Sequence, residues 1–235
     1  MGAPQDNPLI PELHERPTSV FLHGTSRPLL NWVLYAILTR TEADYHWTDV
    51  RFDQEVLDPR DPFALGVVSP NHMSIIEPKE LARTRPPGPP PTGPATGENE
   101  PSVDPRLSEF LGLSRHTQET ISRVQKSGRV PLLGLSNAHR AAGFYPVEFV
   151  QPTLKAILGS GVSMIMTWAD AVPGGSAAFD FVLGVEGSDP ATWRDAQLRC
   201  NLGYSRGPLR AGRVYRLGDV ASVAEVLGRF NIPGL

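Results

Sequence analysis

The pattern of apolar and polar residues along the chain predicts strands that alternate with helices. Residues 130–135 and 162–168 are apolar at nearly every position, which is typical of strands buried on both faces of a parallel sheet. Three shorter β-prone runs in the first third of the chain are further candidate strands: residues 19–23, 46–52 and 63–69. We therefore expect a sheet as the centre of the fold.

Helical periodicity appears between these strands. Residues 29–38 are apolar on almost all sides, with Ser26 as a candidate N-cap and Pro28 in the first turn, so this helix is expected between layers or at an interface. Ser114 is a candidate cap for a second helix. The apolar face of that helix consists of Thr117, Ile121 and Val124. Further helices are expected at residues 105–111, 151–158 and 220–229.

This order of elements predicts an α/β fold with a mostly parallel sheet covered by helices on both faces. Residues 178–186 and 213–217 are strand candidates without an intervening helix, so an antiparallel extension is expected near the C-terminus. We expect a flexible segment at residues 1–17 and a single domain at 18–235. Residues 84–105 hold eight prolines and three glycines and are expected to be a disordered insertion in that domain. The alternative is a proline-rich docking motif.

Composition narrows the class of protein. The 235 residues include 40% hydrophobic ones and carry a formal net charge of −3, which excludes global disorder and an overall basic, nucleic-acid-binding surface. The single cysteine, Cys200, excludes a disulfide framework, and the six histidines lack the spacing of metal ligands. The spacing of the histidines therefore predicts no metal site. The N-terminus has no apolar core of the kind found in a signal peptide, so we expect a soluble cytoplasmic protein.

Four segments together resemble the RecA/KaiC-like branch of the P-loop ATPases. They correspond to its phosphate-loop strand, loop and helix, its Walker B strand, the next strand and the hairpin after it: residues 19–31, 130–137, 161–168 and 178–187. The resemblance covers residues 18–218 apart from the insertion. It implies a RecA-like fold and a nucleotide site at the carboxyl ends of the strands.

The residues that such a site needs are missing. Counting from Gly24, the second glycine, the lysine and the hydroxyl of G-x-x-x-x-G-K-[ST] fall on Leu29, Leu30 and Asn31. Ser136 and Asn137 stand where an aspartate would end the Walker B strand. We therefore expect no catalytic residue and no cofactor, and binding of magnesium–ATP is not expected.

Polar residues follow several predicted strands at the edge where α/β proteins place ligands. The candidate ligand-binding residues are His23, Gly24, Thr25, Ser26, Arg27, Asn137, His139 and Asp170. For the loop after residue 135, a contact with a neighbouring subunit is an equal alternative. Asp170 is the candidate general base or ligand partner, with a turn cap as its alternative.

Charge is unevenly distributed. Residues 196–216 contain five arginines and no acid, and Arg206, Arg210 and Arg213 are interface candidates. This stretch could pair with the acidic stretch 42–61 of a second subunit, or contact nucleic acid.

Taken together, these features predict an inactive RecA/KaiC-like homologue that acts through protein contacts, as a regulatory or scaffold protein. The alternatives are a nucleotide- or ligand-binding enzyme with a remodelled phosphate loop, and a DNA-associated protein that uses the arginine-rich carboxyl third.

Overall fold

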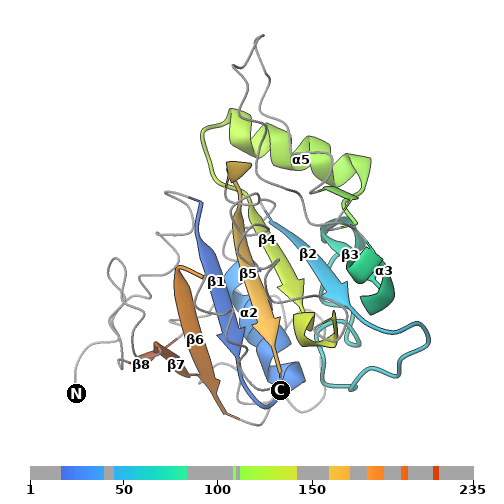
Figure 1. Ribbon diagram of the computed structural model, residues 1–235, viewed down its shortest axis with the longest axis vertical. Helices are drawn as coiled ribbons and strands as arrows, with labels where there is room; N and C mark the ends of the chain where they lie inside the picture. The colour runs from blue at the N-terminus through green and yellow to red at the C-terminus, as the bar shows by residue number, and fades with distance from the viewer. Residues whose placement is uncertain are drawn as a thin grey trace.

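A sheet of eight strands forms the centre of the computed structural model (Figure 1). The structure describes residues 17–39, 45–83, 108–109, 112–141, 159–169, 179–187, 197–200 and 214–216. The strands are β1 (Ser19–His23), β2 (Tyr45–Val50), β3 (Met73–Ile76), β4 (Leu132–Ser136), β5 (Ser163–Trp168), β6 (Phe181–Glu186), β7 (Gln197–Cys200) and β8 (Val214–Arg216). Their order in the sheet is β3-β2-β4-β5-β1-β6-β7-β8.

The six strands β1 to β6 pair in parallel, so their carboxyl ends meet at one edge of the sheet. β7 pairs antiparallel with β6, and β8 pairs antiparallel with β7. The prediction of an α/β protein with a parallel sheet is confirmed. The polar residues that follow β1, β4 and β5 are thereby brought to neighbouring positions, because these strands are adjacent.

One face of the sheet is covered by α2 (Arg27–Thr39), which follows β1 directly and contacts β4 and β5. Every residue from Leu29 to Leu38 is buried, as the apolar pattern predicts. Helix and sheet approach closely at Gly134, where a Cβ atom would lie 2.9 Å from a methyl group of Leu38. A side chain at this position would therefore force the side chain of Leu38 to move. Val20 and Leu22 of β1 belong to the same apolar core.

A second apolar core contains Phe21, the residue of β1 between those two, because successive side chains of a strand point to opposite faces. Ile121 and Val124 of α5 (Arg115–Lys126) contribute to this core. α5 begins where predicted, since Ser114 Oγ accepts a hydrogen bond from Thr117 N at 3.2 Å. In Figure 1, α5 lies at the end of the sheet opposite the strand arrowheads, away from the candidate edge.

The strand predicted at residues 63–69 is wrong. This segment forms successive turns, with hydrogen bonds from Leu65 N to Asp61 O, from Gly66 N to Phe63 O and from Val67 N to Pro62 O. Local carbonyl partners thus satisfy backbone groups that a strand would offer to a neighbour. The strand at the sheet edge is instead β3, which pairs with β2 and follows the short 3-10 helix η2 (Pro70–His72).

Two further elements escaped the sequence analysis, α3 (Pro78–Arg83) and β7. η3 (Ala138–Ala141), a 3-10 helix, follows β4 and contacts α3. The proline-rich insertion, the helices expected at residues 151–158 and 220–229, and the segment 1–16 lie outside the described residues. Among the described helices, none is long and apolar enough to span a bilayer.

Candidate functional site

The loop that follows β1 lies at the carboxyl edge of the sheet. Gly24 N donates to Trp168 O of β5 at 3.2 Å, which ties the start of the loop to the neighbouring strand. Thr25 is exposed, and Ser26 Oγ accepts from Leu29 N at 3.4 Å as the cap of α2. A Cβ on Gly24 would lie 3.1 Å from Val185 O. Close packing on β6 is therefore enough to explain this glycine without a bound anion.

The side chains at the phosphate-loop positions lie in the protein interior. Leu29 and Leu30 are each 1% exposed and belong to the first apolar core. Asn31 is also buried, and its Nδ2 donates to Asp61 Oδ2 at 2.7 Å. Two aliphatic side chains and one hydrogen-bonded amide thus fill these three positions.

Asp61 is a buried carboxylate beside α2. It is 1% exposed, and its Oδ1 accepts from Phe63 N at 3.0 Å. Burial raises the pKa of Asp61 to about 6, helped by the negative charge of Asp49 and opposed by the hydrogen bonds from Phe63 and Asn31. Asp61 therefore takes up or releases its proton near pH 6, where most carboxyl groups of proteins are already ionised.

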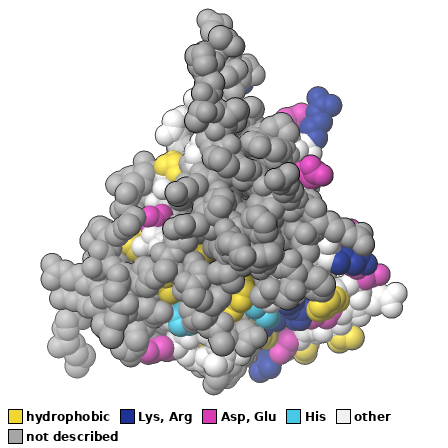
Figure 2. Space-filling view, viewed as in Figure 1, with side chains coloured by type: hydrophobic (Ala, Val, Ile, Leu, Met, Phe, Trp, Pro, Cys, Tyr) yellow, Lys and Arg dark blue, Asp and Glu magenta, His cyan; other side chains and the backbone are white. Residues whose placement is uncertain are grey.

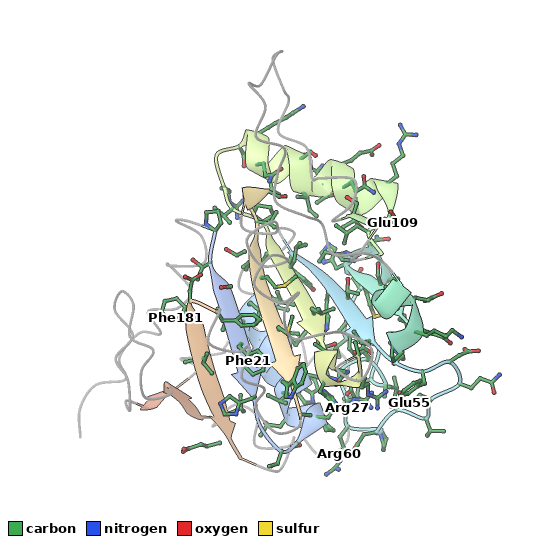
Figure 3. The ribbon with its side chains drawn as sticks, in the orientation of Figure 1. Phe21, Arg27, Glu55, Arg60, Glu109 and Phe181 are labelled. Atoms are coloured by element: carbon green, nitrogen blue, oxygen red, sulfur yellow. The ribbon has the colours of Figure 1, made fainter. Side chains whose placement is uncertain are left out.

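Two arginines converge on Glu55, and Figure 3 shows Arg27 and Glu55 at the carboxyl edge. Arg27 Nη1 donates to Glu55 Oε1 from the first residue of α2. Arg140, in η3, donates through Nη1 to Oε2 and through Nη2 to Oε1, the latter at 2.7 Å. Burial would raise the pKa of Glu55, but the hydrogen bonds and charges of Arg140 and Arg27 outweigh it and lower the pKa to about 2. This cluster joins segments that follow β1, β2 and β4.

A second polar cluster lies at the ends of β2 and β4. Asp49 Oδ1 accepts from Ser136 Oγ at 2.5 Å and from Asn137 Nδ2 at 2.6 Å. Its Oδ2 lies 2.9 Å from Arg51 Nε, and Trp47 Nε1 donates to Ser136 Oγ at 2.8 Å. Ser136 and Asn137, at the end of β4, are thus held as donors to an aspartate on the neighbouring strand.

The turn after β4 orients Asn137 and His139. Asn137 adopts a left-handed backbone conformation (φ 58°), which asparagine tolerates better than most residues, and its N donates to Thr167 Oγ1 at 3.0 Å. His139 Nδ1 accepts from Ala169 N at 3.3 Å, so this nitrogen carries no proton in the described arrangement. The backbone N of Asn137 and the side chain of His139 therefore have structural partners on or just after β5.

Seven of the eight candidate ligand residues lie at this one edge of the sheet: His23, Gly24, Thr25, Ser26, Arg27, Asn137 and His139. Asp170 lies outside the described residues, as do the interface candidates Arg206, Arg210 and Arg213. The sequence predicted that the seven candidate residues lie at this edge, but it did not predict the acidic residues that form hydrogen bonds with some of them.

The acids missed were Asp49, Glu55 and Asp61, which the sequence analysis grouped into an acidic stretch facing a second subunit. The structure gives all three intramolecular partners, and Asp58 also pairs with Arg60 at 2.8 Å. The available signal was the position of Asp49 near the end of a predicted strand. Such a residue faces the polar groups that follow neighbouring strands.

The chemistry of this edge is that of ion pairs and amide hydrogen bonds within the chain. Within the described ranges, no group of three histidine, cysteine or acidic residues could hold a metal ion. Six polar atoms at this edge are buried without a hydrogen-bond partner in the part of the chain that the structure describes: Arg27 Nε, Arg27 Nη2, Asn31 Oδ1, Asp49 Oδ2, Arg51 Nε and Arg51 Nη2. A comparison with protein-family models and with curated proteins finds no match for this chain.

Proposed function

We propose that this chain is a catalytically inactive relative of the RecA/KaiC-like ATPases that acts through protein contacts, as a regulatory or scaffold protein. The observation that carries the proposal is the burial of Leu30, 1% exposed, where the family's phosphate-binding lysine would stand. Phosphoryl transfer depends on positioned charge, and a leucine supplies none.

The sheet supports the family resemblance on which this proposal rests. The four segments that resemble the family contain β1, β4, β5 and β6, and these are four consecutive strands in the order β4-β5-β1-β6. Two apolar cores, one including α2 and the other α5, support helices on both faces of the sheet. The antiparallel pairing of β6, β7 and β8 supports the proposed extension at the C-terminal side.

Hydrogen bonds and ion pairs within the chain occupy the polar side chains near the proposed nucleotide site, and this supports the proposal that the chain is catalytically inactive. The hydroxyl that would meet magnesium is replaced by Asn31, whose amide is engaged by Asp61. Asp49, the carboxylate near the Walker B position, accepts from Ser136 and Asn137 and pairs with Arg51. Charge-assisted contacts are worth about 1.5–3 kcal/mol each, so losing the lysine contact weakens phosphate binding even before the magnesium site is considered.

Exposed apolar side chains beside the sheet edge support protein contacts. Val56 is 93% exposed, and Phe52 and Ile75 are each 53% exposed. Arg51 N donates to Ile76 O at 3.1 Å, so the loop that carries Phe52 and Val56 starts beside the end of β3. β3 is the edge strand of the sheet, and edge strands present unpaired backbone groups to a partner. Figure 2 shows hydrophobic side chains at the surface on the lower right, next to charged ones.

Sedimentation velocity of the full chain over a range of protein concentrations tests this contact surface, with a second copy of the chain as its partner. We expect self-association that is lost in Val56→Asp and Ile75→Asp. Gln54→Asp in the same loop is the matched control, since Gln54 is polar and already exposed. A wild-type chain that is monomeric at every concentration, or variants that associate as well as the wild type, would contradict self-association through this surface.

A second candidate function is an anionic-ligand site at the remodelled loop, and one observation favours it. Glu55 uses only Nη1 of Arg27, and Nε and Nη2 of this arginine are buried without a partner in the described residues. The Nε–Nη2 edge of a guanidinium is suited to two parallel hydrogen bonds to an oxyanion. Thermal-shift measurements with nucleotides, with and without magnesium, separate the two functions. A shift that disappears in Arg27→Gln favours the ligand site, and no shift favours the protein-contact function.

A further inference from the structure

A cavity of about 120 Å³ lies at the end of the sheet opposite the candidate site. The cavity is lined by residues from the start of β2, from η2 and from residues 116–124 of α5. The volume is about four times the ~30 Å³ that one water molecule takes up in the liquid, which is enough for a small ion. The polar residues that line the cavity are Tyr45, His46, Asn71, His72, His116, Thr117, Thr120 and Arg123.

The hydrogen bonds around His46 fix its tautomer and remove it from ligand binding. Ser74 Oγ donates to Gly112 O at 3.0 Å, so it must accept from His46 Nε2, which lies 2.9 Å away. His46 Nδ1 is then an acceptor, and Thr117 Oγ1 donates to it at 3.4 Å. His46 is thus a neutral residue with both nitrogens engaged, and it forms one wall of the cavity.

The remaining polar groups of the cavity are cationic or amide groups. Arg123 brings a positive charge, and His72 and His116 bring imidazole nitrogens that can donate hydrogen bonds. Asn71 adds an amide that can donate. None of the described residues that line the cavity is acidic. Glu119 of α5 instead pairs with Arg115 at 3.0 Å.

The charges of the histidines around the cavity affect the pKa values of neighbouring histidines. Burial, and then the positive charge of His116, lower the pKa of His72, and the charge of His72 adds to burial in lowering the pKa of His46 to about 4. No acidic side chain among the described residues lines the cavity, and Glu119, which lines a neighbouring surface groove with Arg123, pairs with Arg115. An anion seated between the imidazoles and the guanidinium would relieve that repulsion.

We propose that this cavity is a binding site for a small tetrahedral oxyanion of the sulfate or phosphate class, held by His72, His116 and Arg123. Binding takes up protons, since the anion favours the charged imidazoles. By linkage, the affinity for the anion rises as the pH falls and His72 takes up a proton. The site is independent of the proposed function, because it lies at the other end of the strands.

Sulfate is the probe that tests the proposal, because its charge stays constant across this pH range whereas that of phosphate changes. Isothermal titration of the full chain with sulfate, at constant ionic strength in chloride, is made at about pH 5.5 and about pH 8. We expect affinity at least about tenfold higher at the lower pH, with proton uptake revealed by buffers of different ionisation enthalpy. Binding that is equally strong at both values, or no binding at either, would overturn the site.

Variants place the anion in the cavity. His72→Asn and Arg123→Gln are expected to weaken sulfate binding at about pH 5.5 by about tenfold each. Arg115→Gln is the matched control on the same helix, since its side chain is 93% exposed and does not line the cavity. Equal losses in all three variants would indicate general attraction to a positive surface and overturn the proposal. Far-UV circular dichroism confirms that each variant is folded.

The source of the oxyanion is distinguished by two further titrations at the same pH. Inorganic phosphate alone supports a free ion as the ligand, and equal binding of glycerol 3-phosphate supports the phosphoryl end of a larger molecule. Failure of both probes in a chain that binds sulfate would overturn the phosphate arm of the proposal and leave sulfate as the ligand.

Discussion

Arg140 Nη2 lies 2.7 Å from Glu55 Oε1, across 85 residues of sequence. The same carboxylate accepts from Arg27, so one acid neutralises two arginines that come from different loops. The three side chains are 16–20% exposed, which makes this a largely buried contact. It ties the loop after β2 to the start of α2 and to η3. The candidate edge is thereby held together by its own charges.

Glu55→Gln is expected to destabilise the fold by about 1–3 kcal/mol, since it leaves two largely buried guanidinium groups without a carboxylate. Urea unfolding of the wild type and the variant at neutral pH measures this difference. Asp58→Asn is the control, because the Asp58–Arg60 pair has an arginine that is 61% exposed and should contribute little. An effect of Glu55→Gln no larger than that of the control would contradict the structural role of the cluster.

The effect of Glu55 depends on pH in a defined direction. Its pKa in the folded protein, about 2, lies below the ordinary value of 4.5. Its contribution to stability is therefore complete above about pH 4.5 and is lost as the pH falls toward 2. The difference in unfolding free energy between the wild type and Glu55→Gln should shrink over the same window, and a difference that grows there would be inconsistent with this assignment.

Asp61→Asn is expected to be at least as stable as the wild type near pH 7.5. The folded pKa of Asp61, about 6, is raised above its ordinary value of 3.8, so the wild type loses stability as the pH rises from about 4 to about 6, by about 3 kcal/mol. An asparagine at position 61 could still accept from Phe63 N and could donate to Asn31 Oδ1, which is buried without a described partner.

Urea unfolding at several pH values checks this expectation. The stability of Asp61→Asn should lack the decline that the wild type shows between about pH 4 and pH 6. Asp61→Ala is the contrasting variant, because it removes the acceptor of both Phe63 N and Asn31 Nδ2 and should cost about 1–3 kcal/mol. Parallel pH profiles for the wild type and Asp61→Asn would show that Asp61 is not the group that titrates.

Leu30→Lys introduces the lysine that the proposed relationship to the RecA/KaiC-like ATPases would require, and it is expected to destabilise the fold by about 3–5 kcal/mol without creating magnesium–ATP binding. Leu30 lies in the first apolar core, where an ammonium group would be desolvated and unpaired. Leu30→Met is the volume-matched control and should cost less than about 1.5 kcal/mol. Thermal unfolding with and without magnesium–ATP compares the variants, and a well-folded Leu30→Lys chain that binds the nucleotide would contradict this packing.

The elements that the sequence predicted well have signals contained within a few residues. α5 combines an N-cap at Ser114 with apolar residues at helical spacing, and the structure buries Thr117, Ile121 and Val124 as that pattern requires. β4 and β5 are continuous apolar runs, a pattern typical of buried strands in a parallel sheet. For such elements, hydrophobic periodicity and one cap are sufficient.

The elements and contacts that the sequence did not predict depend on partners far along the chain. Residues 63–69 alternate like a strand, but the side chain of Asp61 and local carbonyls hold them in turns. β3 is four residues long, with one buried position, so its pattern is too weak to detect. The partners of Glu55 lie 28 and 85 residues away, and nothing near Glu55 in the sequence selects them over a second subunit.

His46 is expected to make the protein sensitive to acid. Its pKa in the folded protein, about 4, is below the ordinary value of 6.5, so its contribution to stability is complete above about pH 6.5 and is lost as the pH falls to about 4. The loss amounts to about 3 kcal/mol. Comparing urea midpoints of the wild type and His46→Asn in chloride buffers measures it. The wild type should fall more steeply between these pH values, and a flatter profile would count against the neutral, hydrogen-bonded His46.

The most direct measurement of the central claim is isothermal titration of the full chain with magnesium–ATP. With Leu30 in the core and Asn31 bonded to Asp61, we expect no binding up to millimolar nucleotide. A micromolar dissociation constant for the wild type that is lost in Asn31→Ala would contradict the account, since the nucleotide would then occupy the phosphate loop.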